Sequence, residues 1–328
     1  MLDFLSQQYG QAHEALYRYL IEPLLYQFGL MHWAEDAFNG AEWILLGLIQ
    51  IALIAFGLRF WERFNPAEVQ NRQAKSISAD VFYTYFHRLG LFNAIIFVVF
   101  ADLFFQFEGQ LHDWRFERFN VESWWPGVTS IPWVSFLIYL IILDFVDYCY
   151  HRAEHRFQWW WQLHALHHSQ ATMTAWSDDR NHFLDDVMRA LVFASCALII
   201  GVSPGQFILL VVVSQFIQSW QHANLKVHLA WAKYILVSPI FHRRHHAVRL
   251  GYEVENRHGV LGGCNFGVLF PWWDMIFKTA NFDQQIHPTG VENLHLPNGV
   301  LQHQWQGLKM AWRAFFGHPK DTKDVKDT

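Results

Sequence analysis

The composition of this 328-residue chain is apolar and aromatic, which limits the classes of protein to which it can belong. Hydrophobic residues make up 52%, with 17 Trp and 30 Phe, and charged residues only 16%, against roughly 25% in soluble domains. Because mean hydropathy is only slightly positive, we predict an all-α, multi-pass membrane bundle with a polar part beside the bilayer. A net charge of −5 excludes the basic surface that nucleic-acid binding requires.

The first 134 residues predict an interfacial segment followed by two membrane spans. Residues 1–42 are predicted to form an amphipathic segment at the membrane surface. Residues 43–134 are predicted to contain the first transmembrane helices and their linker, with spans over 43–60 and 89–105. A third apolar run, 132–150, has a similar length, and each run is close to the roughly 20 residues that cross a hydrocarbon core.

The second half of the chain predicts a shorter helical hairpin and an amphipathic end. The apolar stretch 187–221 is interrupted by Ser203-Pro204-Gly205, and each half is at the short end for a span. With this hairpin we expect four or five spans in total. Residues 281–328 predict an interfacial C-terminal helix and, over KDTKDVKDT, a disordered tail.

Basic residues in the linker after the first span predict the orientation. Lys and Arg of short loops are retained on the cytoplasmic side, and this linker contains Arg59, Arg63, Arg72 and Lys75. Counting the spans onward, the third span and the hairpin both end on that side. We therefore predict a histidine-rich helical cap on the cytoplasmic face, in a bacterial inner membrane.

Three histidine clusters follow these span ends, and their spacing is typical of metal ligands. Residues three and four apart project from one face of a helix, and twenty histidines at random positions would give roughly 0.07 occurrences of His-x-x-His-His in a chain of this length. The motif occurs twice, after a His-x-x-x-His pair. The clusters are His151 and His155; His164, His167 and His168; and His242, His245 and His246.

The number of histidines favours two metal ions over one. Imidazole suits iron, zinc, copper and nickel, so the ligand type alone leaves the metal open. A structural zinc closes with four ligands, whereas eight histidines are available here. The first cluster, His151-Arg152-Ala153-Glu154-His155, lacks the His-Glu-x-x-His pattern of zinc proteases. Two redox-active irons are therefore the favoured interpretation.

With these three motifs, the sequence resembles the fatty acid hydroxylase and sterol desaturase superfamily of integral membrane di-iron enzymes. The resemblance covers residues 135–280, our predicted catalytic domain. It implies that the eight box histidines coordinate two iron ions, with dioxygen as co-substrate, for hydroxylation or desaturation of a C–H bond in a lipid such as a sterol or fatty acyl lipid. Further matching residues are Asp144, Tyr148, Arg152, Trp161, Ser169, Arg180, His182, Asn265, Phe266, Gly267, Trp273, Asp274, Phe277 and Thr279.

The sequence departs from the family pattern after the third histidine box. A longer segment than we expect, containing His258, separates His246 from Asn265. Asp185-Asp186 also stands where many relatives have Pro-Leu-Glu. We therefore expect a reshaped site entrance and an atypical substrate.

Several residues outside the boxes are candidates for the site. Asp144 and Asp147 stand at the end of an apolar helix, where an ionisable group is costly, and Asp147 is one turn before His151. Such a carboxylate could accept the second N–H of a ligating imidazole or only be solvated at the headgroups. His222 is a possible ninth ligand, and His182 is either a ligand or part of a solvated charged face.

The remaining predictions concern the electron donor and an alternative, non-enzymatic function. No haem- or flavin-binding segment is evident, so the enzyme reading requires an external electron donor: a ferredoxin, a cytochrome or a reductase. The alternative is a membrane metal transporter or metal sensor that uses the same clusters. Such a protein would place polar ligands along its transmembrane path, yet the predicted spans contain few charges. The sequence specifies neither the lipid nor the oligomeric state.

Overall fold

The computed structural model describes residues 2–69, 77–248, 263–292, 294, 296 and 299–317, and this part of the chain is all-helical. Only two isolated β-bridges occur in it, Pro66 with Leu225 and Ala247 with Thr289, so the predicted fold class is confirmed. The α-helices are α1 (Leu2–Leu16), α2 (Glu22–Gln27), α3 (Ala34–Ala52), α4 (Arg59–Phe64), α5 (Ile77–Arg88), α6 (Leu91–Asp113), α7 (Pro132–Arg156), α8 (Gln158–His168), α9 (Phe183–Ile200), α10 (Pro204–His222), α11 (Pro239–His245), α12 (Trp272–Ile276) and α13 (Val300–Phe316). Short π-helical stretches are Tyr17–Ile21 and Leu53–Leu58, and 3₁₀ turns are Met31–Trp33, Val121–Ser123 and Ala230–Tyr234.

Three helical segments are long and apolar enough to cross a membrane, as predicted. They are Met31–Phe64 (34 residues), in which α3 continues through the π-helical stretch into α4, Leu91–Asp113 (23 residues, α6) and Pro132–Arg156 (25 residues, α7). Each is longer than the roughly 20 residues that a bilayer core requires. The protein is therefore a multi-pass membrane protein.

The predicted hairpin is present as α9 and α10, but neither helix qualifies as a span. Gly201, at φ +77°, ends α9, and the Ser203 hydroxyl accepts a hydrogen bond from the Gln206 N–H at the start of α10. Three charged residues, Asp185, Asp186 and Arg189, lie in the first half of α9, and α10 contains four glutamines. By length and composition, the described residues therefore give three candidate spans, and the hairpin would supply the further ones expected.

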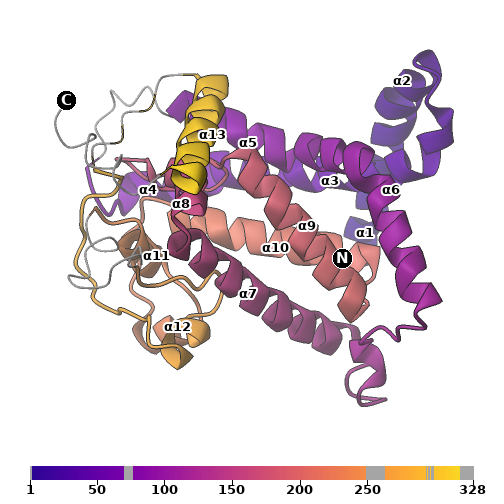
Figure 1. The fold of residues 1–328 in the computed structure, drawn as a ribbon. Helices are drawn as coiled ribbons and strands as arrows, with labels where there is room; N and C mark the ends of the chain where they lie inside the picture. The colour runs from indigo at the N-terminus through magenta and orange to yellow at the C-terminus, as the bar shows by residue number, and fades with distance from the viewer. Residues whose placement is uncertain are drawn as a thin grey trace.

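Figure 1 shows how the helices bring the histidine boxes together: the ends of α7 and α10 meet α8 and α11 at one side of the bundle. α13, drawn in yellow, packs along α8. One face of α13 is buried at His303, Gly307 and Ala311, while Trp305 and Trp312 on the other face are exposed. This amphipathic pattern agrees with the helix expected within 281–328, whose position at the membrane surface stays a prediction. The predicted disordered tail, the segment around His258, Arg72 and Lys75 lie outside the described residues.

Two groups of buried apolar side chains fix the helices that bear the site. One group joins α7 to α10 and to residues 268–269, with Tyr139 and Leu210 at its centre. The other joins the first span to the loop before α9, through Ile54 and Trp176. Burial of each large apolar side chain stabilises the fold by about 1.5–3 kcal/mol. These contacts hold α7, α10 and the loops between them in fixed relative positions.

Candidate metal centre

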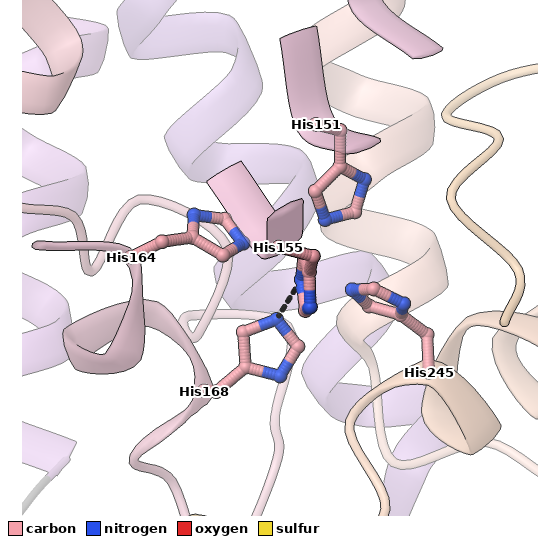
Figure 2. Close-up of side chains that lie close together, drawn as sticks. All are labelled: His151, His155, His164, His168 and His245. Carbon is pink, nitrogen blue, oxygen red and sulfur yellow. Dashed lines mark hydrogen bonds between the residues drawn. The ribbon is translucent and has the colours of Figure 1, made fainter. Parts of the chain in front are cut away.

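Five buried imidazoles from three helices converge at the first histidine cluster (Figure 2). One ring nitrogen of each lies within 4.8 Å of the corresponding nitrogen of the others. The Nε2 atoms of His155 and His168 are only 3.2 Å apart. The members are His151 and His155 from α7, His164 and His168 from α8, and His245 from α11.

Four further buried imidazoles form the second histidine cluster directly beside the first: His167, His222, His242 and His246. The Nε2 atom of His222 lies 3.1 Å from that of His167 and 3.0 Å from that of His242. The two clusters adjoin, since the rings of His168 and His246 are stacked with centroids 4.2 Å apart. His222, the possible ninth ligand, is therefore placed among the candidate metal-binding residues.

Helix geometry explains why each His-x-x-His-His box is divided between the two clusters. Residues four apart lie nearly above one another, whereas a residue in between points to a different side. On α8, His164 and His168 belong to the first cluster and His167 to the second. On α11, His245 belongs to the first cluster. His242 and His246, the residue directly after α11, belong to the second. Each box therefore contributes to both clusters.

Hydrogen bonds to Nδ1 orient three rings of the first cluster. The Nδ1 atom of His151 is 2.9 Å from the Phe266 carbonyl oxygen, and that of His245 is 2.8 Å from the Cys264 carbonyl oxygen. The Nδ1 atom of His164 is 3.2 Å from Glu154 Oε1 and 3.6 Å from Asp185 Oδ2. Within the described residues, the Nε2 atoms of these three histidines are buried without a hydrogen-bond partner. Such an arrangement fixes the tautomer and directs Nε2 toward a metal.

The second cluster contains a similar arrangement around His222. Its Nδ1 is 2.9 Å from the Gln218 carbonyl oxygen and 3.3 Å from Asp178 Oδ1. Its Nε2 is therefore the atom available to a ligand at the centre of the cluster. Asp178 in turn contacts Arg88, so the second cluster is connected to a buried ionic network.

Burial keeps most of these rings neutral. Burial lowers the pKa of His245 to about 3, and burial together with neighbouring imidazoles lowers the pKa values of His168 and His246 well below their usual range. His164 differs: burial acts to lower its pKa, but the Glu154 and Asp185 carboxylates outweigh burial and raise it to about 9. Neutral imidazoles have the lone pair that a metal requires, and an ion at His164 would displace a proton.

The residues present fit two metal ions. Nine imidazoles offer one nitrogen each in a set of five and a set of four. The Nε2 separations of 3.0–3.2 Å are short enough for these nitrogens to bind the same ion, since metal–nitrogen bonds are about 2.0–2.1 Å long. Glu154 and Asp185, which adjoin the first cluster, add negative charge next to it.

The two aspartates on α7 have structural partners other than histidine. Asp144 accepts hydrogen bonds from the Leu269 and Phe270 N–H groups, at 2.7 and 3.2 Å, and from the Trp273 indole at 2.8 Å. Asp147 is paired with Arg189 at 2.6 Å. The suggested carboxylate–imidazole contact therefore comes from Glu154 and Asp185 instead, because these residues face the α8 ring and Asp147 faces α9.

Arg180 and Asn265 have partners outside the two histidine clusters. Arg180 forms an ion pair with the buried Asp80. Asn265, at φ +63°, donates to the Phe241 carbonyl oxygen at 2.9 Å and accepts from the Asn281 N–H at 2.6 Å. It therefore joins α11 to the segment after α12.

His182 is the one candidate ligand that the structure does not bring to either cluster. Its Nδ1 accepts the Leu184 N–H at 3.2 Å and caps α9, while its Nε2 is 2.7 Å from the Gln304 carbonyl oxygen. With both ring nitrogens in hydrogen bonds, His182 is a residue that joins α9 to α13. It is omitted from the ligand set proposed below.

A buried ionic network beside the second cluster was not predicted from the sequence. Asp178 and Asp179, expected to lie on a solvated face if His182 were no ligand, are buried and both contact Arg88. Next to them, His87 is 3.0 Å from Asp186. Two basic residues at the end of α5 and the acidic stretch near the start of α9 are the sequence signal for such a network. Whether these charged side chains are buried depends on the packing of distant helices.

A cavity of about 380 Å³ opens from the histidine clusters into the helical bundle between α6, α7, α9 and α10. His151, His167, His222 and His242 line its inner end. Its outer part is apolar, with Phe97, Leu140, Phe193, Phe207 and Leu210 among the lining residues. The two histidine clusters are therefore open to an apolar chamber.

Comparison with known proteins assigns this region to a family. Residues 136–279 match the family model for fatty acid hydroxylase, close to our predicted domain at 135–280. The chain is similar to the ornithine lipid hydroxylase OlsE of Rhizobium tropici (26% identity over 155 residues, 47% of this chain and 43% of that protein). It is also similar to alkylglycerol monooxygenase of Caenorhabditis elegans (26% over 201 residues, 60% and 37%) and to fatty acid hydroxylase vlmA of a Lecanicillium species (24% over 179 residues, 52% and 47%).

The matches share the part of the chain that forms the histidine clusters. The chain spans less than half the length of each of these three relatives. No solved structure matches it. The family model covers all three histidine boxes on α7, α8 and α11, together with His222. Residues 136–279 of this chain, the part that forms the histidine clusters, thus match the fatty acid hydroxylase family.

Proposed function

We propose that this protein is a dioxygen-dependent di-iron oxygenase that hydroxylates or desaturates a C–H bond of a membrane lipid. The main supporting observation is the pair of adjoining histidine clusters at the inner end of an apolar cavity. The relatives named above bear the names of a hydroxylase of ornithine lipids, a monooxygenase of alkylglycerols and a fatty acid hydroxylase. A lipid substrate agrees with all three names and with a cavity that lies within the membrane-spanning part.

The chain's own residues bind, orient and shield the reactive site. His151, His155, His164, His168 and His245 would hold one iron, and His167, His222, His242 and His246 the other. Bound iron would supply the redox chemistry that reduces dioxygen and oxidises the lipid. Carbonyl and carboxylate partners at Nδ1 keep the imidazoles in position, and the apolar cavity walls exclude water and hold the lipid chain.

The predicted topology supports a side of the membrane for the electron donor. Since the boxes follow span ends on the side with the basic linker, we propose that they face the cytoplasm of a bacterial inner membrane. A ferredoxin, a cytochrome or a reductase would then supply electrons from that side.

Metal content and product formation test the proposal together. The full chain, purified and loaded with iron, is expected to contain about two iron ions and, with dioxygen and an electron donor, to oxidise membrane lipids. His167→Ala should reduce iron to about one ion per chain and abolish oxidation. His112→Ala is the matched control because His112, with its side chain 92% exposed, lies at the end of α6 away from the clusters. One ion or none in the unmodified chain would contradict the di-iron site.

Lipid oxidation, compared with metal uptake into vesicles, separates the enzyme from the metal transporter or sensor. A transporter needs ligands along its path, whereas among the described spans only α7 contributes to the clusters, and only at its end. Metal uptake into vesicles without any oxidised lipid would favour the transporter.

A further inference from the structure

A set of polar side chains lines the cavity in addition to the histidines and the apolar residues. We call it the polar collar, and it consists of Asn93 from α6, Asp147 from α7, Arg189 from α9, and Gln215 and Gln218 from α10. Each of the four helices around the cavity contributes at least one member. Polar groups that line an otherwise apolar cavity are costly unless they form hydrogen bonds, so they point to a polar group of a bound molecule.

Helix spacing places Asp147, Arg189 and Gln218 of the polar collar about one turn from the histidine clusters. Asp147 precedes His151 by four residues on α7, and Gln218 precedes His222 by four residues on α10, which is about 6 Å along each helix. Arg189 is at the level of Asp147, because the two side chains form an ion pair at 2.6 Å. An atom of a bound molecule that is held at the polar collar is therefore only a few bond lengths from the imidazole nitrogens of the clusters.

The polar collar has unused hydrogen-bonding capacity. A guanidinium has five N–H donors, and Arg189 directs one of them at Asp147. The Arg189 side chain lines the cavity and is 31% exposed. In the described part of the chain, no hydrogen bond is formed by the side-chain amides of Asn93 and Gln215, and Asp147 Oδ1 is buried without a partner. The N–H groups of Arg189, Asn93 and Gln215 are donors available to oxygen atoms of a bound molecule, and Asp147 Oδ1 can accept a hydrogen bond from a hydroxyl.

The charges on the wall determine which oxygen group fits. The cation of Arg189 is already paired, and His87 pairs with Asp186. An added phosphate or carboxylate would therefore lie among acidic side chains, whereas an uncharged oxygen would meet free N–H donors without this repulsion. The carboxyl residues that line the cavity are Asp144, Asp147, Glu154, Asp178, Asp179, Asp185 and Asp186.

We propose that the polar collar binds an uncharged oxygen-bearing group of the lipid: an ester or amide carbonyl, an ether or a hydroxyl. The hydrocarbon tail then occupies the outer part of the cavity beside Phe193, Phe207 and Leu210. The C–H bond presented to the metal site lies within a few bonds of that oxygen. This inference rests on the proposed function, and it specifies lipids oxidised near their polar end instead of in mid-chain.

Binding of matched sixteen-carbon probes to the purified full chain in detergent tests the proposal. Tritiated monopalmitoylglycerol is the neutral probe, and hexadecane and hexadecyl phosphate are unlabelled competitors. We expect both competitors to displace it at least about 10-fold less well than unlabelled monopalmitoylglycerol. Equal competition by hexadecane, or stronger competition by hexadecyl phosphate, would overturn the proposal.

Substitutions in the polar collar provide the second arm of the test. Arg189→Met should weaken probe binding about 10-fold or more, and Asn93→Leu and Gln215→Leu by about 2- to 10-fold, as expected for one lost hydrogen bond each. The two Leu variants change no charge, so they remain informative if Arg189→Met fails to fold. Arg118→Met is the control, since Arg118 forms an exposed ion pair with Glu108. Unchanged binding in both Leu variants would refute the role of the collar.

Binding measured with and without iron separates this inference from the proposed function. An iron-loaded chain that binds monopalmitoylglycerol but oxidises no lipid would contradict the oxygenase and leave the binding role intact. A chain that oxidises lipids while all three variants bind the probe normally would contradict the collar alone. Equal iron content in the variants and the unmodified chain would show that the substitutions act on the lipid.

Discussion

Replacing Arg88 with methionine should destabilise the protein strongly, although Arg88 contacts none of the histidine ligands. Its side chain is fully buried at the end of α5. It donates to Asp178 at 2.6 Å, Asp179 at 2.8 Å, Gln50 at 2.7 Å and Ser219 at 3.0 Å. One guanidinium therefore joins α3, α5, α10 and the loop before α9.

The size of the effect follows from what the substitution leaves behind. Two carboxylates whose side chains are only 8% and 9% exposed would lose their cation. Removing one partner of a buried ion pair costs about 3–5 kcal/mol, which is roughly two to four orders of magnitude in the unfolding equilibrium. Asp178 would also lose the contact that holds it 3.3 Å from His222 Nδ1, so iron affinity at the second cluster should fall as well.

Thermal unfolding in detergent, at one scan rate, measures the loss. Arg88→Met should lower the midpoint markedly, whereas Arg118→Met removes an exposed pair worth about 1 kcal/mol or less. The triple variant Arg88→Met, Asp178→Asn, Asp179→Asn should recover much of the midpoint, because no buried charge is then left unpaired. Its iron affinity should stay low, since Asp178 no longer supports His222 as a carboxylate. A midpoint for Arg88→Met equal to that of Arg118→Met would refute the reasoning.

Three further predictions concern pH, iron affinity and helix packing. Burial acts to lower the pKa of His87, but Asp186 outweighs burial and raises the pKa to about 9. The folded state then holds a proton that the unfolded chain releases near pH 6.5, so the free energy of unfolding should fall between about pH 6.5 and 9. His87→Gln should flatten this slope in denaturation titrations. Asp185→Asn should weaken iron binding about 10- to 100-fold in chelator competition, and an unchanged affinity would exclude an orienting role. A methyl group at Gly47 would approach the backbone oxygen of Arg88 to 1.7 Å, so Gly47→Ala should lower the free energy of unfolding by about 1–3 kcal/mol or more. Gly57→Ala is the control and should be tolerated, because a methyl group there has nothing within 4 Å. Equal unfolding midpoints for the two variants would contradict the close approach of α3 and α5.

Local sequence patterns predicted the features that depend on local spacing. The three long apolar runs predicted the spans, since length and hydropathy are properties of one segment. The histidine boxes predicted a metal site because residues three and four apart share a helix face. The hairpin was recognised at Ser203 and Gly205, but the three charged residues of α9 and the four glutamines of α10 distinguish its halves from spans. Both helices line the cavity.

The division of the boxes into two clusters was not predictable in the same way. Which histidines share an ion depends on how α8 and α11 rotate against α7 and α10, and this rotation is fixed by packing between distant residues. His222 illustrates the difficulty, since a lone histidine has no spacing that distinguishes a ligand from a solvated ring. Asp147 illustrates the reverse, because its position one turn before His151 suggested an imidazole partner, and the structure supplies Arg189.

The acidic residues around the site link its stability to its chemistry. Unpaired carboxylates at this depth would be costly, yet the structure pairs Asp178 and Asp179 with Arg88, and Asp186 with His87. Glu154 and Asp185 instead share the protonated His164, whose proton a bound ion would displace. Glu154 and Asp185, next to the first cluster, thus have no Arg or Lys partner in the described residues, and divalent ions bound there would provide positive charge. Loss of metal should therefore destabilise this end of the bundle, and added iron should raise the thermal midpoint of the metal-free chain.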